Sequence, residues 1–222
     1  MLYYFTKQDE LSPLPTVQGL EIQEVDDPRL MSVLGQISLE EARKRFANEH
    51  KAYVAYLHQV PAAFGWMAMG KARIGELNHE FILPLSHRYL WNFRTLPDFR
   101  GLGIYPQLLQ YIIASEKAHS DCFWIMHAPE NNASQRGIRK AGFKLVGKVS
   151  VVEGSEVIFT EEGDEVALHD ALDTFSFIKS EKQAASCWNC SSPYLVNRKK
   201  ECCCKSDNRE CTHHLYQVIH TV

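Results

Sequence analysis

The segment Thr95-Leu96-Pro97-Asp98-Phe99-Arg100-Gly101-Leu102-Gly103-Ile104-Tyr105 joins an expected strand to an expected helix. Its two glycines allow a tight turn and a close approach of the backbone to a ligand. The helix that follows offers unpaired N–H groups and the positive end of its dipole. With Arg100, these groups predict an anion site suited to a pyrophosphate, whereas an ordinary glycine-containing turn is the alternative.

Two common nucleotide motifs do not fit this segment. A Rossmann fingerprint needs a third glycine where Pro106 stands, and an acid at the C-terminal end of the next strand. Asp121 instead stands at the start of that strand. A Walker loop is excluded because no Gly-Lys-Ser/Thr follows the glycines.

The residues before this segment predict one strand, two helices and then about four antiparallel strands. The first helix has Asp26 or Asp27 as its cap and Pro28 at its start, and a capping box at Ser38 opens the second, which runs to about Asn48. The expected strands are Leu20–Val25, Lys51–His58, Ala62–Met69, Ile74–Leu83 and Tyr89–Thr95, with a turn at Gln59-Val60-Pro61.

The residues after the segment predict a helix, a strand, a helix and a final hairpin. Helical spacing of apolar residues begins at Ile104, and Cys122–Ala128 is apolar on both faces like a buried strand. The other expected elements are a helix at Asn132–Ala141 closed by Gly142, and the strands Phe143–Val152 and Glu156–Thr160. The order predicts a mixed α/β (α+β) layer fold, not a regular βαβ series.

Composition is that of an ordinary globular protein. The 222 residues are 45% hydrophobic and 23% charged, enough for one domain with an appendage. The net charge of -3 does not suggest nucleic-acid binding. The chain has neither an apolar run of membrane-spanning length nor a secretory signal at Met1–Phe5, so we expect a cytoplasmic protein without membrane partners.

A second motif stands further along the chain, in Asn131-Asn132-Ala133-Ser134-Gln135-Arg136-Gly137-Ile138-Arg139-Lys140-Ala141-Gly142-Phe143. It resembles the Asn-x-x-Ala/Ser…Lys-x-Gly-Phe helix of the GNAT superfamily of N-acetyltransferases. The Arg100 segment resembles the acetyl-CoA loop of the same family, Arg/Gln-x-x-Gly-x-Gly/Ala. The resemblance covers about Leu20 to Thr160.

The resemblance implies a mostly antiparallel central sheet flanked by helices, with acetyl-CoA as cosubstrate. The strand with Phe93, Arg94 and Thr95 would splay from the strand with Ile125, Met126 and His127, and pantetheine would lie in the wedge. Asn131 and Ser134 would contact the pantetheine or CoA end. The pyrophosphate would lie on the amides of Arg100, Gly101, Leu102, Gly103, Ile104 and Tyr105.

Two residues depart from the family pattern. Tyr105 replaces the last Gly/Ala of the loop, so its ring either crowds the backbone approach or covers the CoA. Ile138 stands where many relatives have a tyrosine that protonates the leaving thiolate.

The implied reaction is direct transfer of an acetyl group to a primary amine within a ternary complex. A protonated amine needs a general base or a water relay. The candidates are Glu80 first and Glu76 second, expected on one face of a single strand, then His79, His127 and Asp98. The alternative function is a non-catalytic acyl-CoA-binding or zinc-dependent interaction module. The sequence sets neither the acceptor nor the oligomeric state, although a dimer is compatible.

We expect residues 1–163 to form the acetyltransferase-like domain, and residues 164–222 to form an acidic helix and a Cys-rich tail. Leu168, Leu172 and Phe175 predict a helix docked on the core, and a docking surface for a basic partner is the alternative. Cys122 is expected in the core. A zinc site is possible in the tail, and a frayed tail is its alternative; the candidate ligands are Cys187, Cys190, Cys202, Cys203, Cys204 and Cys211.

Overall fold

The computed structural model describes residues 1–152, 156–181 and 187–195. Its helices are α1 (Pro28–Gly35), α2 (Leu39–Ala47), α3 (Ile104–Glu116), α4 (Asn132–Lys140), α5 (Leu168–Phe175) and α6 (Trp188–Ser191). Its strands are β1 (Leu2–Thr6), β2 (Leu20–Val25), β3 (Lys51–Leu57), β4 (Val60–Ala68), β5 (Lys71–Ile74), β6 (His79–Ile82), β7 (His87–Thr95), β8 (Cys122–Met126), β9 (Lys144–Val152), β10 (Glu156–Glu161) and β11 (Ile178–Lys179).

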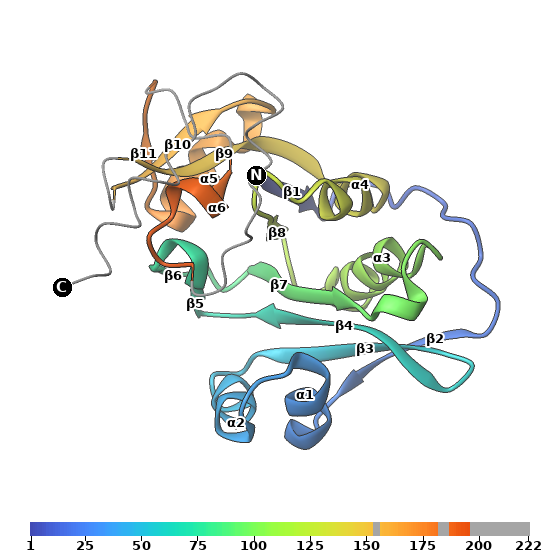
Figure 1. The fold of residues 1–222 in the computed structure, drawn as a ribbon. Coiled ribbons are helices and arrows are strands. Elements are labelled where there is room, and N and C mark those ends of the chain that lie inside the picture. The colour runs from blue at the N-terminus through green and yellow to red at the C-terminus, as the bar shows by residue number, and fades with distance from the viewer. Residues whose placement is uncertain (153–155, 182–186, 196–222) are drawn as a thin grey trace.

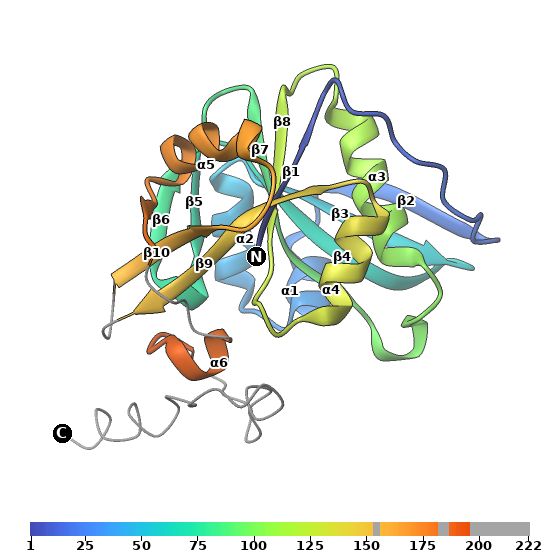
Figure 2. The ribbon, with the colours of Figure 1, turned by 90° about the horizontal axis from the view of Figure 1, so that it is seen from above.

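The main sheet has nine strands in the order β11-β10-β9-β1-β8-β7-β4-β3-β2. Only the pairs β7–β8 and β10–β11 are parallel among the described residues. Helices α1 and α2 cover one face of β2, β3, β4 and β7, and α3 lies on the opposite face (Figure 1). Seen from above, α3 and α4 lie on one side of the central strands and α5 lies on the other (Figure 2). The expected mixed, mostly antiparallel sheet flanked by helices is confirmed.

The central strand β1 was not among the strands predicted from the sequence. Tyr3 and Phe5 face α3 and α4, whereas Leu2 and Tyr4 belong to the cluster beneath α5. A strand buried on both faces shows no alternation of apolar and polar residues. Its partners β8 and β9 also lie more than a hundred residues away in the chain, so nothing local marks it as a strand.

The expected single strand Ile74–Leu83 is wrong. A 3₁₀ turn at Gly75–Leu77 interrupts it, and Asn78 takes the left-handed conformation with φ of 50°. The flanking strands β5 and β6 then pair with each other as a separate two-stranded sheet. The turn between β3 and β4 also differs, because His58 and Gln59, both at positive φ, make it in place of Gln59-Val60-Pro61.

The predicted helix signals are confirmed. Asp27 accepts hydrogen bonds from the first amides of α1, and Ser38 accepts one from Glu41 in α2. Gly142 follows α4 at a φ of 101°, a conformation that glycine adopts without strain. Helix α5 is docked, with Phe175 fully buried in the core.

Cys122 is buried as expected, and burial raises the pKa of its thiol. Cys187 is also buried, whereas Cys202, Cys203, Cys204 and Cys211 lie outside the described residues. Within residues 1–152, 156–181 and 187–195, no group of three His, Cys, Asp or Glu side chains could hold a metal. The zinc site therefore stays a prediction. In the same ranges, every helix is too short or too polar to cross a bilayer.

A buried carboxylate fixes the end of α3 to the sheet. Glu116, with its side chain only 7% exposed, accepts hydrogen bonds from Lys51 Nζ at 2.6 Å and Arg88 Nε at 3.5 Å. The Tyr53 hydroxyl lies 3.3 Å from the same carboxylate. Burial alone would raise the pKa of Glu116, but hydrogen bonds and charge from Lys51 and Arg88 lower it on balance. Leaving one partner of such a buried pair uncompensated costs several kcal/mol.

We predict that Glu116→Gln destabilises the protein by roughly 3 kcal/mol at pH 7. The lowered pKa means that Glu116 contributes fully above the unfolded-state value of about 4.3, and that its contribution is lost as the pH falls through the folded-state pKa. The variant should therefore lose less stability than the wild type as the pH falls below about 5 in urea titrations. Glu10→Gln, at an exposed position, is the control, and an unchanged acid limb in Glu116→Gln would contradict the prediction.

Candidate active site

Strand β7 loses its pairing with β8 about half-way along its own length, near the end of β8. Their parallel register runs from His87↔Cys122 to Leu90↔Ile125, and β7 continues to Thr95 beyond the last pair. On the other side of β7, a bulge places Asn92 at a φ of 52° where the register against β4 shifts. The Phe93 ring lies against Gly65, where any side chain would clash, because an added Cβ would be 2.0 Å from the ring.

A cavity of about 820 Å³ occupies this wedge and extends beyond it. That volume is in the range of ligand pockets. Its walls come from α2, the β5–β6 turn, β7, the end of β8, α3, α4 and the segment that contains α6. They are formed by Arg45, Arg73, Ile74, Gly75, Glu76, Asn78, Tyr89, Leu90, Trp91, Asn92, Phe93, Tyr105, Ile125, Met126, His127, Ala128, Asn131, Ser134, Trp188, Tyr194 and Leu195.

The glycine loop lies beside one end of the cavity. Gly101 and Gly103 both have positive φ, 81° and 79°, and α3 begins at the next residue, Ile104. Gly103 caps α3 without any side-chain hydrogen bond, so the amides of the first turn are left to an outside acceptor. Arg100 is exposed, and its Nε donates to the Thr95 carbonyl at 3.2 Å. This is the strand–loop–helix setting expected of an anion site.

Tyr105 lies between α3 and α4, where it forms part of the cavity wall. Its ring packs on Gly137, where an added Cβ would be 2.3 Å from the ring, and its centroid is 5.6 Å from that of Phe93. Burial raises the pKa of Tyr105, although a hydrogen bond with Ser134 acts the other way. The tyrosine is thus accommodated because its neighbour in α4 has no side chain.

The other residues expected to bind CoA divide into two groups. Asn131 and Ser134 line the cavity, and Asn131 Oδ1 also caps α4 by accepting from the Ser134 amide at 3.1 Å. Phe93 lines it as well, whereas Arg94, Thr95, Leu102 and Ile104 do not. Arg94 is exposed and donates to Gln36 at 2.8 Å, Leu102 is exposed in the loop, and Ile104 is buried in the core.

The two carboxylates proposed as bases lie in different places. Glu76 is in the 3₁₀ turn before β6 and lines the cavity. Glu80 is on β6, outside the cavity wall, where it forms an ion pair with Lys71 at 2.9 Å. A hydrogen bond from Lys71 lowers the pKa of Glu80. Of the two, only Glu76 lines the cavity, and the shared strand face predicted for them does not exist.

Of the other candidates, only His127 reaches the cavity. Burial lowers its pKa to about 4, so the imidazole is neutral at pH 7. Its Nδ1 is 2.7 Å from the Ala128 carbonyl and must carry the proton, because a carbonyl only accepts. Nε2 keeps its lone pair, 3.4 Å from the Tyr3 hydroxyl. His79 instead contacts the Phe175 carbonyl, and Asp98 is exposed outside the cavity wall.

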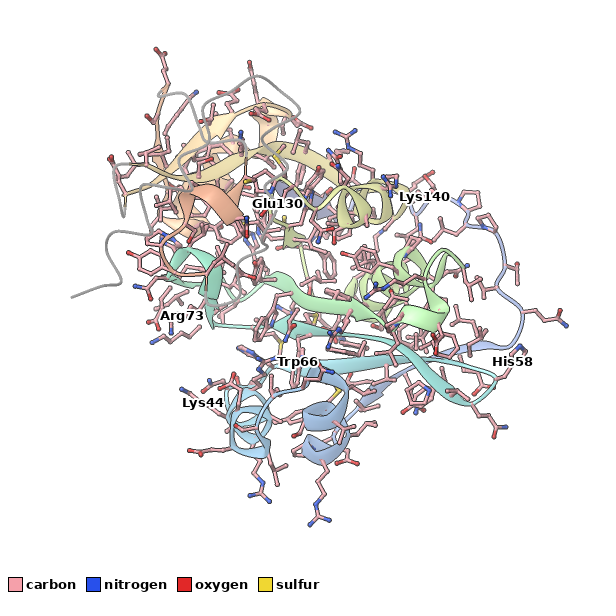
Figure 3. The ribbon with its side chains drawn as sticks, in the orientation of Figure 1. Lys44, His58, Trp66, Arg73, Glu130 and Lys140 are labelled. Atoms are coloured by element: carbon pink, nitrogen blue, oxygen red, sulfur yellow. The ribbon has the colours of Figure 1, made fainter. Side chains whose placement is uncertain are left out.

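A segment from the C-terminal part of the chain closes one wall of the cavity. Glu130, before α4 (Figure 3), accepts hydrogen bonds from the amides of Trp188 at 3.1 Å and Asn189 at 3.0 Å. The Trp188 indole donates to the Val149 carbonyl at 2.7 Å. Trp188, Tyr194 and Leu195 thereby join the wall. No sequence pattern predicted this, because the three residues lie outside both motifs.

Comparison with known proteins is consistent with this geometry. The model of the acetyltransferase (GNAT) family matches residues 20–143, more than half of the chain. The chain belongs to the GNAT family. No curated protein is similar enough in sequence to count as a match.

Several solved structures are similar to this GNAT chain. The ribosomal-protein-S18-alanine N-acetyltransferase of Escherichia coli is 15% identical, with a TM-score of 0.48, and the match covers 61% of this chain and 83% of that one. An aminoglycoside antibiotic 6'-N-acetyltransferase from Acinetobacter baumannii is 18% identical, with a TM-score of 0.46 and coverages of 61% and 97%. A GCN5-related N-acetyltransferase from Kribbella flavida is 14% identical, with a TM-score of 0.41, and the match covers 56% of this chain but only 46% of that protein.

One departure from the GNAT pattern is visible in the core. Ile138, at the position where many relatives have the tyrosine acid, is fully buried and packs with the apolar residues beneath α3. Tyr105, on the neighbouring helix α3, packs on Gly137, the residue before Ile138, and belongs to the cavity wall.

We predict that Gly103→Ala weakens binding of CoA about tenfold or more, equivalent to about 1.4 kcal/mol. The added methyl group would meet only Val17, at 4.0 Å, in the free protein, but it would stand where the phosphates approach the backbone. Gly70→Ala is the matched control, because Gly70 has a similar φ of 66° and open space around it. Both variants should lose about 1–2 kcal/mol of stability from backbone strain. Equal CoA affinities in calorimetric titrations of the two variants would remove the assignment.

Proposed function

We propose that this protein transfers an acetyl group from acetyl-CoA to a primary amine, by direct attack within a ternary complex. The observation that carries the proposal is the position of the cavity. It fills the wedge between β7 and β8, reaches Tyr105 at the start of α3, and has the carboxylate of Glu76 in its wall. The thioester end of acetyl-CoA and an acceptor amine could therefore meet inside one cavity.

The glycine loop and the wedge would hold the cosubstrate. The uncapped first turn of α3 and the charge of Arg100 suit the pyrophosphate. Beyond Leu90, the edge of β7 that faces away from β4 has no partner strand among the described residues, and it suits the amide groups of pantetheine. Bound acetyl-CoA supplies the activated acyl group as a thioester. Asn131 and Ser134 would contact the cofactor from the side of α4.

The acceptor amine must lose a proton before it attacks. For an amine with a pKa near 10.4, deprotonation at pH 7 costs about 4–5 kcal/mol. Glu76 is the carboxylate in the cavity wall and is our candidate for the group that receives this proton, directly or through water. The neutral Nε2 of His127 is the second candidate.

A proton donor for the leaving thiolate can come from Tyr105. Burial raises the pKa of its phenol, so the hydroxyl stays protonated at neutral pH and can donate a hydrogen bond in the cavity. Tyr105 could therefore take over the role of the tyrosine that many relatives have at the position of Ile138.

A non-catalytic acyl-CoA-binding module is the second candidate function. The burial of Ile138 favours it, because the proton donor used by many relatives is missing from its usual position. Under this alternative, CoA and acetyl-CoA bind but acetyl-CoA is not consumed in the presence of any amine.

The deciding experiment measures CoA release from acetyl-CoA with a panel of amines: diamines, amino acids, aminoglycosides and short peptides. We expect release that depends on at least one amine and exceeds the rate of hydrolysis without amine. Calorimetric titration with CoA accompanies it. Tight CoA binding without amine-dependent release would support the binding module and overturn the proposed transfer.

We predict that Glu76→Gln lowers the transfer rate by a factor of about 100 or more, because the amine loses its proton acceptor. The acidic limb of the pH–rate profile should disappear, while CoA affinity stays unchanged because the phosphate loop is separate. Glu80→Gln is the matched control, a carboxylate four residues further along the chain and outside the cavity wall, which should keep the normal rate. A normal rate and profile in Glu76→Gln would point to His127 or to a water relay instead.

A further inference from the structure

The end of the cavity near α2 contains an arginine that is almost completely buried. Arg45 is 9% exposed, and its guanidinium lies over two indole rings, 5.2 Å from the centroid of Trp66 and 4.5 Å from that of Trp91. Trp66 lies on the sheet face that α1 and α2 cover (Figure 3). Arg45 and Trp91 both belong to the cavity wall.

Arg45 has far fewer partners than its donors require. Its hydrogen bond within the described residues is from Nε to Glu41 Oε1, at 2.9 Å, and that carboxylate is itself 43% exposed. The Nη1 atom is shielded from solvent and has no acceptor in the same part of the chain. A guanidinium has five donors arranged in a planar fork, and a buried donor without an acceptor is costly.

The two indoles beside Arg45 show the same deficit. The Nε1 atoms of Trp66 and Trp91 are buried, and neither has a hydrogen-bond acceptor within the described ranges. Three buried N–H donors on side chains that contact one another, one of them charged, thus lack an acceptor among the described residues, and two of these side chains, Arg45 and Trp91, line the cavity. Buried polar groups in native proteins are usually paired, so this deficit indicates a ligand that supplies oxygen atoms.

The charged residues in the cavity wall are few and come from both signs. The charged residues in its described wall are two arginines, Arg45 and Arg73, and one carboxylate, Glu76. Arg73 is exposed on β5 (Figure 3) and donates to Asn78. The nearby Lys71 is already paired with Glu80. Glu41 already pairs with Arg45, and Glu76 offsets the charge of Arg73. An anion would therefore be held by the unmatched N–H donors of Arg45 and not by a net positive charge.

We propose that Arg45 and Trp91 form a binding site for the carboxylate of the acceptor, so that the acceptor is a small amino acid-like amine. This inference rests on the proposed acetyl transfer, since it names the class of amine. A carboxylate matches the planar fork of arginine in two parallel hydrogen bonds, and Trp91 Nε1 would give a third. Because Arg45 Nη1 and Trp91 Nε1 are both shielded in the free protein, both side chains turn toward the cavity on binding. The acceptor's amine then extends toward Glu76.

The first test compares amino acids with the amines that remain when their carboxylate is removed: lysine with cadaverine, ornithine with putrescine, tyrosine with tyramine and histidine with histamine. All twenty protein amino acids are titrated calorimetrically in the presence of CoA, which cannot transfer an acetyl group. We expect at least one amino acid to bind at least tenfold more tightly than its decarboxylated amine. Equal affinities in every pair, or no binding of any amino acid, would overturn the proposal.

Three variants assign the site to Arg45. Arg45→Gln should abolish the preference for the carboxylate, and Arg45→Lys should keep only part of it, because lysine retains the charge but not the fork. Arg43→Gln is the control, an exposed arginine two residues away on α2, and should retain the full preference. Thermal melts identify any variant that fails to fold. A full preference in folded Arg45→Gln would overturn the proposal.

A spectroscopic test does not depend on turnover or on the stability of the Arg45 variants. The chain has four tryptophans, so ¹⁵N labelling of the indoles gives four N–H resonances. Trp91→Phe, which keeps an aromatic ring beside Arg45, identifies the Trp91 signal. The amino acid should shift that signal, and its decarboxylated amine should not. An unshifted Trp91 signal under saturating amino acid would overturn the site, whereas binding and shift without acetyl transfer would overturn only the proposed transfer.

Discussion

The separation of β7 from β8 after Leu90 and Ile125 is the constraint on which the site depends. Two parallel strands that stayed paired would fill the middle of the sheet with hydrogen bonds and side chains. The bulge at Asn92 and the glycine at position 65 hold β7 against β4 instead, with the Phe93 ring in the space where Gly65 has no side chain. The edge of β7 that would otherwise pair with β8 is thereby left open. A cavity forms there, between two central strands of the nine-stranded sheet.

The strands beside the wedge are held by the core around them. Strand β1 pairs with both β8 and β9, so the sheet is continuous on the β8 side of the wedge. On the other side, Glu116 ties α3 to β3 and β7 through Lys51 and Arg88. Helix α3 carries the glycine loop at its opposite end, and the loop is therefore positioned by a buried ion pair more than ten residues away.

The two ends of the cavity are built from different parts of the chain. The end near Tyr105 comes from the two GNAT motifs, on α3 and α4. The other end comes from α2, the β5–β6 turn and the segment with Trp188, whose amide is held by Glu130. That segment lies beyond the matched family region, as does the wall formed by Tyr194 and Leu195. Elements outside the motifs would thus select the acceptor, whereas the motifs would serve the common cosubstrate.

The sequence by itself determined the mixed sheet, the helix caps and the glycine loop. These features follow from local chemistry: Asp27 and Ser38 accept amide hydrogen bonds, and Gly103 takes a positive φ at the start of a helix. Tertiary structure alone decided the rest. Strand β1 is buried on both faces and pairs with strands that are far away in the sequence, so no local pattern predicts it. The separate places of Glu76 and Glu80, and the meeting of Arg45 with Trp91, depend on how distant segments pack, and residue order along the chain does not contain those distances.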